Sequence, residues 1–384
     1  MAVATPPAEA EPEQFSVVIP HYNDAASLAR TLASLRASPS NANVETIVVD
    51  DHSAKPLSLL DPSVSVIRLP HNQGPAAARN VGAAAASSAF VAFVDSGVEV
   101  TSEQLATLVT YFDDPATACV APRIIAAAGD TTIARYEKER SPLDMGDRSS
   151  TVKPNTTLAY VPSTCLVVRK STFADEGGFD EQLRFGEDVD LVWRLQSESV
   201  VRFVSAIEAT HPPRGNLKAF VKQRAGYGSS AANLAIKHPQ FTTPLIIDKW
   251  GAATIASVLL GQPIIGFGIA AYRAHLLSQS LPNEIEGRSS LAATIIMRGQ
   301  VAGARGLVES LTRPYAPLAI AGALLAPHRV LPFVVASAGL RAKGLWKSPA
   351  FVGLSVVDDL AYSTGVWQNV IRHRSARCLI PRIM

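Results

Sequence analysis

The residues in this sequence that are best suited to chemistry are carboxylates that follow short apolar runs. Asp50 and Asp51 close one such run, and Asp95 closes another. A carboxylate at the end of a strand can accept hydrogen bonds from a nucleobase imide or a ribose hydroxyl. It can also bind Mg²⁺ or Mn²⁺ that bridges a diphosphate. We interpret Asp50 and Asp51 as nucleoside ligands and Asp95 as a ligand of such a cation, although a capping or turn role would suit each residue alone.

A second acidic pair, Glu187 and Asp188, lies where a predicted helix over 187–196 begins. Negative charge is favourable at a helix N-terminus, and a carboxylate there could take a proton from an incoming hydroxyl group. Ordinary capping is the alternative reading of the pair. His211 follows about one strand later, and it becomes a candidate metal ligand only if the fold brings it to Asp95.

The stretch from His71 to Gly82 combines a flexible turn with a basic residue. Gly74 permits an unusual turn into a helix, and Arg79, one turn later, could reach the base or phosphate of a nucleotide. The loop after the first apolar run reads Pro-His-Tyr-Asn-Asp and contains neither the glycines of a dinucleotide fingerprint nor a Walker lysine. This excludes a Rossmann oxidoreductase and a P-loop nucleotidase.

The elements that must position these residues alternate between strand and helix. Near-continuous apolar strands in such an order predict an α/β fold with a mostly parallel sheet flanked by helices, and ligands of such sheets lie beyond the carboxyl ends of the strands. A polar segment over 140–157 is predicted to be a mobile loop near the site. The strands are predicted over 15–20, 45–50, 64–69, 90–95, 119–122 and 161–169, and the helices over 24–35, 75–86 and 101–112.

The chain divides into three segments that differ in composition and hydropathy. Residues 1–14 predict a disordered tail, 15–244 a catalytic domain, and 245–384 an apolar helical region. The uncharged run 251–271 is about long enough to cross a bilayer, whereas 316–340 is interrupted by His-Arg and predicts two short helices or a re-entrant pair. Basic residues follow, so we expect a membrane-associated region with a cytoplasmic basic edge. A helical subdomain packed on the catalytic domain is the alternative.

The composition excludes several classes of protein. The chain has 384 residues, of which 47% are hydrophobic and 18% charged, so it is neither disordered nor collagen-like. Its net charge of +2 gives no sign of nucleic-acid binding. Three scattered cysteines exclude a disulfide scaffold and a cysteine-rich zinc site, and they fit a reducing compartment.

Taken in order, the motifs resemble those of the family-2 glycosyltransferases, which have the GT-A fold. Five pieces occur in family-like order and spacing between about Phe15 and His211. They are Pro20 with Tyr22 and Asn23; Asp50-Asp51 with Ser53; Asn72 and Gly74 with Ala78-Arg79-Asn80 and Gly82; Asp95-Ser96; and the stretch Gly177–Arg194.

The resemblance implies transfer of a sugar from a nucleotide diphosphate sugar, with inversion at the anomeric carbon, to a hydroxyl acceptor. Donor-binding residues would be Pro20, Tyr22, Asn23, Asp50, Asp51, Gly74, Arg79 and Asp95. Asp95 would hold a divalent cation, Mn²⁺ or Mg²⁺, with His211 as a further metal ligand; Asp188 would be the general base and Glu187 the fallback. Gly97 stands where the family has a second metal-site acid, which leaves a single carboxylate and raises the alternative of a catalytically weak sugar-nucleotide-binding scaffold.

A narrower likeness is to the actinobacterial mycofactocin-system glycosyltransferases. It depends on Tyr111–Ile124, on Tyr227–Pro239 and on the apolar tail. It implies glucose from UDP-glucose as the transferred sugar, a peptide-derived redox cofactor as acceptor, and a place on the cytoplasmic face of a bacterial plasma membrane. A transferase for a cell-wall or lipid-linked glycan is the nearest rival, and a nucleotidyltransferase is disfavoured because the first loop lacks a glycine-rich basic turn.

Overall fold

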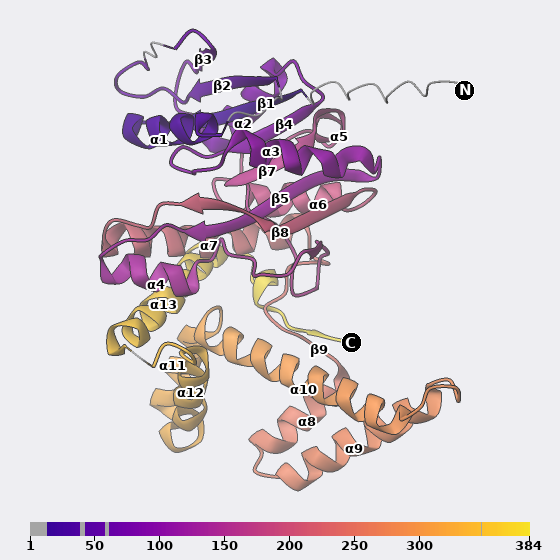
Figure 1. Cartoon of the computed structure of the whole chain (residues 1–384). Coiled ribbons are helices and arrows are strands. Elements are labelled where there is room, and N and C mark those ends of the chain that lie inside the picture. Colours follow the sequence, from indigo (N-terminus) through magenta and orange to yellow (C-terminus); the bar gives the residue numbers. More distant parts are fainter. Residues whose placement is uncertain (1–13, 39–42, 58–60, 347) are drawn as a thin grey trace, which may run out of the picture. The chain divides into compact units, whose positions relative to one another are not determined.

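The computed structural model describes residues 14–38, 43–57, 61–346 and 348–384. They form two compact units, Met1–Gly215 and Asn216–Met384 (Figure 1). All but the last residue of the predicted tail over 1–14 lies outside the described residues. The domain boundary that we predicted at residue 244 falls within the second unit, beyond its first helix.

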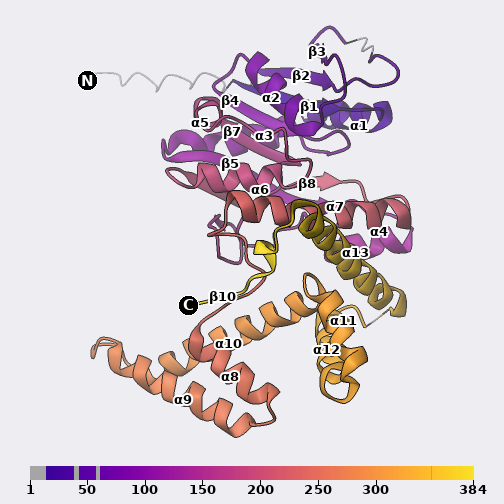
Figure 2. The same cartoon turned by 180° about the vertical axis from the view of Figure 1, so that it is seen from behind.

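An eight-stranded sheet forms the centre of the first unit (Figures 1 and 2). Its strand order is β3-β2-β1-β4-β7-β5-β8-β6, and all neighbouring pairs are parallel except those made by β7 and by β6. The strands are β1 (Phe15–His21), β2 (Val44–Asp50), β3 (Val64–Arg68), β4 (Phe90–Val94), β5 (Thr117–Ala126), β6 (Ser150–Thr151), β7 (Cys165–Arg169) and β8 (Val200–His211). The predicted mostly parallel α/β sheet is confirmed.

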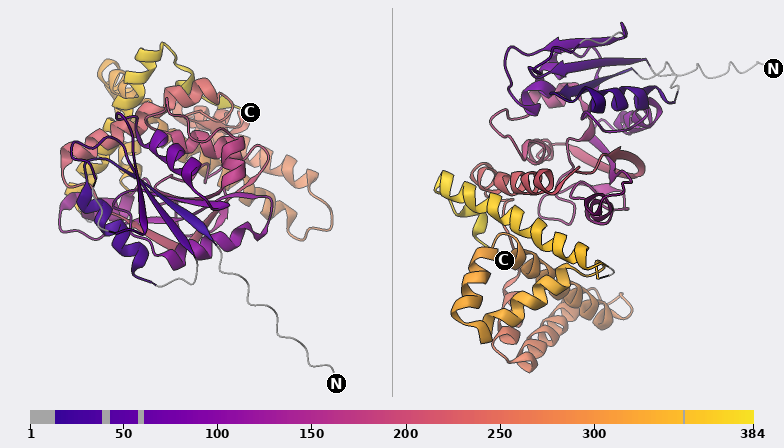
Figure 3. Two further views of the ribbon diagram at one scale, coloured as in Figure 1. Left: turned by 90° about the horizontal axis from the view of Figure 1, so that it is seen from above. Right: turned by 90° about the vertical axis from the view of Figure 1, so that its left-hand side faces the viewer.

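Helices cover both faces of the sheet (Figure 3). Alternate residues of the central strands contribute to two separate cores, one on each face. On β1, Phe15, Val17 and Ile19 pack with α1 (Ala25–Arg36) and α3 (Ser102–Val109), whereas Val18 packs with α2 (Pro75–Ala85) and α6 (Glu187–Leu195). This is the period-two pattern of a strand that is buried on both sides. The remaining helices of this unit are η1 (Thr110–Asp113), α4 (Thr132–Arg140) and α5 (Lys170–Asp175).

Helix α2 lies unusually close to the sheet because of Gly82. A Cβ atom on Gly82 would lie 2.3 Å from Cγ1 of Val18, which leaves no room for a side chain. The close approach fixes the first turn of α2, and therefore Arg79, directly behind the ends of β1 and β4. The helix begins at Pro75, whose missing N–H costs nothing at that position.

The second unit is almost entirely helical. Its helices are α7 (Leu217–Lys237), α8 (Lys249–Leu259), α9 (Pro263–Ser280), α10 (Arg288–Thr312), α11 (Ala316–Leu325), α12 (Pro327–Arg341), α13 (Pro349–His373) and η2 (Arg377–Leu379). Two short strands, β9 (Ile246–Ile247) and β10 (Arg382–Ile383), form a parallel pair. The helical region that the sequence predicts after residue 244 is confirmed, and so is the break of the 316–340 run into two helices.

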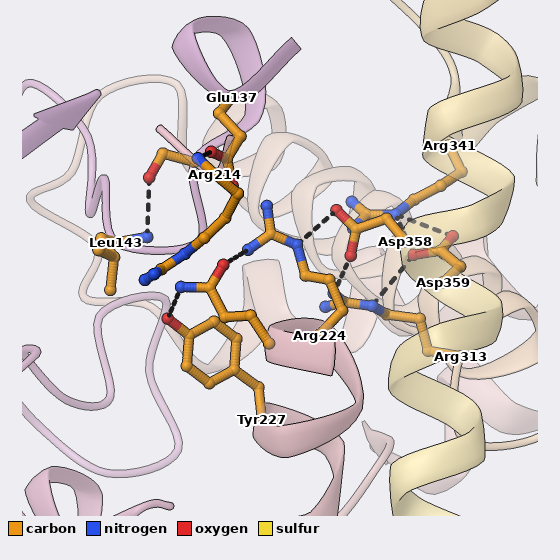
Figure 4. Close-up of polar contacts among 11 residues, drawn as sticks. Glu137, Leu143, Arg214, Arg224, Tyr227, Arg313, Arg341, Asp358 and Asp359 are labelled. Atoms are coloured by element: carbon orange, nitrogen blue, oxygen red, sulfur yellow. Dashed lines mark hydrogen bonds and ion pairs between the residues drawn. The ribbon is translucent and has the colours of Figure 1, made fainter. Parts of the chain in front are cut away.

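Helices α7 and α13 cross at two glycines. A Cβ atom on Gly228 would lie 1.9 Å from the carbonyl oxygen of Tyr362, and one on Gly365 would lie 1.9 Å from that of Ala225. Beside this crossing, three arginines, from α7, from the C-cap of α10 and from α12, converge on two neighbouring aspartates of α13 (Figure 4). The group consists of Arg224, Arg313, Arg341, Asp358 and Asp359. A network of this kind holds four helices in register.

The run 251–271, which we considered long enough to cross a bilayer, is divided between α8 and α9. Gly261 adopts a positive φ of 77°, and Pro263 cannot donate the backbone hydrogen bond that a continuous helix would need. No helix in the described part of the chain is both long and apolar enough to span a membrane.

Candidate active site

Arg79 is the centre of a cluster of acidic residues at the carboxyl end of β4. Its guanidinium donates from Nη2 to Oδ1 of Asp95 at 2.5 Å and from Nη1 to Oε1 of Glu187 at 3.2 Å. The side chain is almost completely buried and lies over the ring of Phe179, 5.3 Å from its centroid. Arg79 therefore joins three segments that are far apart in the sequence: α2, the end of β4 and the start of α6.

The two acids at the start of α6 differ in their access to solvent. Glu187 is buried behind Arg79, whereas Asp188 is partly exposed. Asp188 accepts from the backbone N–H of Val189 at 2.8 Å and of Ser163 at 3.3 Å, which fixes its carboxylate. Asp188 is therefore better placed than Glu187 to meet an incoming hydroxyl group.

Loss of hydration raises the pKa of both carboxyl groups above the usual range. Desolvation, followed by the negative charge of Asp188, raises the pKa of Glu187 to about 7, and Arg79 opposes the rise. Desolvation also raises the pKa of Asp188, against the backbone donors and the charge of Arg79. A carboxyl group whose pKa is raised is a stronger base once it is ionised, as general-base catalysis at neutral pH requires.

Asp50 and Asp51 lie at the predicted strand end, but their oxygens already have partners within the protein. Asp51 accepts from the backbone N–H of Gln73 and Gly74, at 2.7 and 2.8 Å, and from the side chain of Asn72 at 2.7 Å. Asp50 is fully buried and pairs with Arg68. In this arrangement Asp51 shapes the turn into α2, and the carboxylate of Asp50 is engaged by Arg68.

The loops that follow β1 and β2 are joined by a rigid set of hydrogen bonds. Asn23 donates its backbone N–H to the hydroxyl of Ser53 at 2.9 Å, and its side-chain oxygen accepts from Ala54 at 2.8 Å. Asn23 and His52 both have positive φ angles, of 55° and 61°, which is uncommon outside glycine. Tyr22 is 52% exposed beside them, so this rim offers an aromatic face to solvent.

Pro20 and Gly74 have backbone roles. The carbonyl oxygen of Pro20 accepts from the hydroxyl of Ser96 at 2.8 Å, which joins the ends of β1 and β4. Gly74, with φ 96°, is the N-cap of α2 and donates to Asp51. Both residues are buried, so they form the floor of the rim.

His211 comes close to the end of β4 through its neighbour. A Cβ atom on Gly97 would lie 3.2 Å from the ring of Pro212, and the backbones of Glu99 and Thr210 exchange two hydrogen bonds of 2.9 Å. Burial, followed by the charge of Arg214, lowers the pKa of His211 to about 4, so its imidazole is neutral at pH 7. A neutral imidazole is the form that binds metals.

The acidic residues around Arg79 do not form a complete metal-binding site by themselves. Among the residues that the structure describes, no group of three or more His, Cys, Asp or Glu side chains is arranged to hold a metal ion. Asp95, whose side chain is 30% exposed, and His211 offer at most two ligands. Oxygens of a bound ligand would have to complete the coordination shell, as hard cations readily permit.

The structure thus brings together Arg79, Asp95, Glu187 and Asp188, and it places Asp51 at the adjacent turn. We predicted Arg79 as a ligand of the donor, and in the structure its guanidinium is engaged by Asp95 and Glu187. The sequence carried one signal of this role. Arg79 is the basic residue in an otherwise alanine-rich helix that packs on the sheet, where a charge requires partners.

Comparison with known proteins places the chain among glycosyltransferases. The sequence model of glycosyl transferase family 2 matches residues 16–176. The pre-mycofactocin glycosyltransferase of Mycobacterium tuberculosis is 37% identical over 98% of this chain and 84% of that protein. The succinoglycan biosynthesis protein ExoO of Rhizobium meliloti is 28% identical over 49% of this chain and 57% of that protein.

Solved structures are more distant. TarS 1-349 of S. aureus in complex with UDP is 21% identical, with a TM-score of 0.40, over 57% of this chain and 66% of that one. GalNAc-T7 with UDP, GalNAc and Mn²⁺ is 17% identical, with a TM-score of 0.44, over 75% of this chain and 55% of that one.

Proposed function

Because the chain belongs to glycosyl transferase family 2 and is therefore a glycosyltransferase, we propose that it moves glucose from UDP-glucose, with inversion, to a hydroxyl group of the peptide-derived redox cofactor mycofactocin or its precursor. The acceptor is inferred from the name of the mycobacterial relative, and the donor from the family resemblance. The observation that carries the assignment to this site is the convergence of Arg79, Asp95 and Glu187, with Asp188 beside them.

The chain's own residues divide the work by their exposure. Asp188 is the general base: it takes the proton of the acceptor hydroxyl, whose oxygen then attacks the anomeric carbon opposite the leaving diphosphate. Glu187 and Arg79 lie behind it and hold its surroundings in place. The rim of Tyr22, Asn23 and the Asp51 turn receives the nucleoside, with Asp51 acting through the turn that it stabilises.

The charges at the site favour a divalent cation as cofactor, Mn²⁺ or Mg²⁺. Three carboxyl groups, those of Asp95, Glu187 and Asp188, surround the single guanidinium of Arg79. A diphosphate would add further negative charge, which this cluster cannot neutralise. Asp95 and the neutral imidazole of His211 fit as the two protein ligands, and the cation would supply charge neutralisation for the leaving diphosphate.

Gly97 bears on the alternative of a catalytically weak sugar-nucleotide-binding protein. The glycine has a φ of 99°, and a Cβ atom on it would lie 3.2 Å from the ring of Pro212 and 3.4 Å from Cβ of Ser27, so the backbone here is not shaped to carry an acid. The missing carboxylate is therefore built into the local fold, and it leaves the Asp95–Arg79–Glu187 arrangement intact. This observation favours an enzyme whose metal site has few protein ligands over a non-catalytic sugar-nucleotide-binding protein.

The test is a screen of nucleotide sugars for transfer, followed by product mass, with Mn²⁺, with Mg²⁺ and with a chelator. We expect turnover of UDP-glucose that needs a divalent cation. Asp188→Asn should lower the rate by about 10²- to 10⁴-fold, the usual range for a lost general base. Glu198→Gln is the matched control, because Glu198 is an exposed acid just beyond the same helix.

Each outcome has a clear meaning. Equal loss in Asp188→Asn and Glu198→Gln would refute the role of Asp188. Turnover of another nucleotide sugar would replace the proposed donor and leave the site intact. Binding of UDP-glucose with no turnover, in wild type and in Asp188→Asn alike, would establish the scaffold instead. A panel of cell-wall and lipid-linked acceptors beside the mycofactocin precursor tests the acceptor.

A further inference from the structure

Exposed apolar side chains are concentrated in one of the two units. In the described part of the chain, 31 large hydrophobic side chains are exposed, and only Tyr22, Val66 and Tyr111 of these belong to Met1–Gly215. The other 28 belong to Asn216–Met384. Single exposed apolar residues are normal on a protein surface, but a concentration of this kind marks an interaction surface.

The most exposed of these residues lie at two helix turns. Those at the α8–α9 turn are Leu260, Ile264 and Phe267, with exposures of 79%, 87% and 73%, and those at the α11–α12 turn include Leu324 and Leu325, with 78% and 87%. Both turns lie at the lower edge of the second unit in Figures 1 and 2. We call these five side chains the apolar edge.

The charges of the chain are divided in the same way. The first unit carries 17 Lys and Arg against 27 Asp and Glu, a net charge of −10. The second unit carries 18 basic against 6 acidic residues, a net charge of +12. Two of those six acids, Asp358 and Asp359, are buried in ion pairs with arginines and do not face solvent.

Helix α10 shows basic and apolar residues on one exposed face. Leu291, Ile295, Arg298 and Arg305 are all exposed, and their spacings of 4, 3 and 7 residues place them on one side of the helix. This mixture of basic and apolar side chains is typical of helices that lie at the surface of an anionic membrane.

We propose that the second unit docks on an anionic phospholipid bilayer, as on the inner leaflet of a bacterial plasma membrane, with the apolar edge inserted among the lipids and Arg298 and Arg305 beside the headgroups. The net charge of the second unit favours an anionic membrane over a second copy of the chain as the partner of this surface. A second copy that docked through the same surface would bring two units of net charge +12 together, whereas anionic headgroups attract that charge. The proposal does not depend on which sugar or acceptor the enzyme uses.

The test is sedimentation of the full chain with vesicles of phosphatidylcholine alone and of phosphatidylcholine mixed with phosphatidylglycerol. We expect binding to the mixed vesicles that weakens as salt rises, because the Debye length falls from about 8 Å at 0.15 M to about 3 Å at 1 M. The triple variant Leu260→Ser, Ile264→Ser, Phe267→Ser should lower the partition coefficient at least about a hundredfold.

A charge variant and a control separate the contributions. Arg298→Glu with Arg305→Glu should lower binding to the mixed vesicles about tenfold or more and leave the weak binding to phosphatidylcholine unchanged. The matched control, Val66→Ser with Tyr111→Ser, removes exposed apolar side chains from the first unit and should bind like wild type.

Some results would overturn the proposal. One is the absence of binding to mixed vesicles, and another is equal binding by wild type and the triple variant. A third is a self-associated wild type that the triple variant converts to monomers without any vesicle binding, which would assign the surface to a second copy. Donor turnover without vesicles, measured on the same variants, verifies their folding and tests the proposed function separately.

Discussion

Arg79→Met removes the one positive charge that the structure pairs with both Asp95 and Glu187. At the 3.2 Å separation of Arg79 and Glu187, the attraction is about 5 kcal/mol at an effective dielectric constant of about 20. Solvent screening at Asp188 and Asp95, which are partly exposed, offsets much of this attraction. We therefore expect the pKa values of Glu187 and Asp188 to rise by at least about one unit, because Arg79 holds both of them down.

The assay is the pH dependence of kcat/KM for transfer. The base must be ionised, so activity is lost as the pH falls through its pKa, and a raised pKa moves this acidic limb to higher pH. Arg79→Lys keeps the charge and should move the limb less than Arg79→Met does. Loss of a buried ion-pair partner also costs about 3–5 kcal/mol of stability, so rates must be measured well below each variant's melting temperature.

Arg194→Met is the matched control for this experiment. Arg194 is also an arginine of the site region, but the contacts that the structure describes for its guanidinium are with Asp190 and with the carbonyl oxygens of Glu176 and Gly178. It should lower stability and leave the acidic limb in place. An Arg79→Met enzyme whose acidic limb coincides with that of wild type would refute the reasoning that Arg79 sets the pKa of these acids.

Three further substitutions test the packing. Gly97→Asp restores an acid at a residue with φ 99° and should cost about 1–2 kcal/mol; a melting temperature equal to that of wild type would contradict this. Gly228→Ala places a Cβ 1.9 Å from a carbonyl oxygen of α13 and should cost about 3 kcal/mol or more in urea denaturation, whereas Gly353→Ala, with open space around it, should gain about 0.5–1 kcal/mol. Asp358→Asn leaves Arg224 buried with a weaker countercharge and should cost about 3–5 kcal/mol by the same measurement, and a loss below about 1 kcal/mol would count against the network.

The central elements were predictable because local pattern and long-range packing agree there. The strand predicted over 90–95 is β4 at Phe90–Val94, and the helix predicted over 75–86 is α2 at Pro75–Ala85. Each combines an apolar run with a clear signal at its end, such as Pro75 or Asp95. Near-continuous apolar strands can be buried on both sides only by helices on both faces, so the fold class followed from the same pattern.

What the sequence left open depends on contacts between distant segments. The antiparallel direction of β7 cannot be read from its apolar residues, because a strand buried on both faces has the same pattern in either direction. The segment 140–157, predicted to be a loop, contains the short strand β6, which exists through its pairing with β8. Such strands are specified by their neighbours, and a local pattern of two residues carries no signal.

The same limit applies to the site. Strand ends indicated Asp51 and Asp95 as residues of one edge of the sheet, but which of them has exposed oxygens depends on hydrogen bonds to segments distant in the sequence. Both carboxylate oxygens of Asp51 accept hydrogen bonds from the turn at Gln73 and Gly74, whereas the carboxylate of Asp95 is partly exposed. The motifs therefore indicated where these residues lie. The hydrogen bonds then distinguish a residue that stabilises a turn, such as Asp51, from one whose carboxylate is exposed, such as Asp95.

The net charge of the whole chain conceals a large difference between its two units. A total of +2 suggests a nearly neutral protein, yet it is the sum of a catalytic unit at −10 and a helical unit at +12. A unit with that excess of acid opposes an incoming anionic donor, and its central arginine is already engaged by Asp95 and Glu187. The raised pKa values of Glu187 and Asp188 arise from burial in this crowded group of acids. In the proposed mechanism, burial raises the pKa of the base Asp188, and the negative charge of the same cluster calls for a cation beside the donor diphosphate.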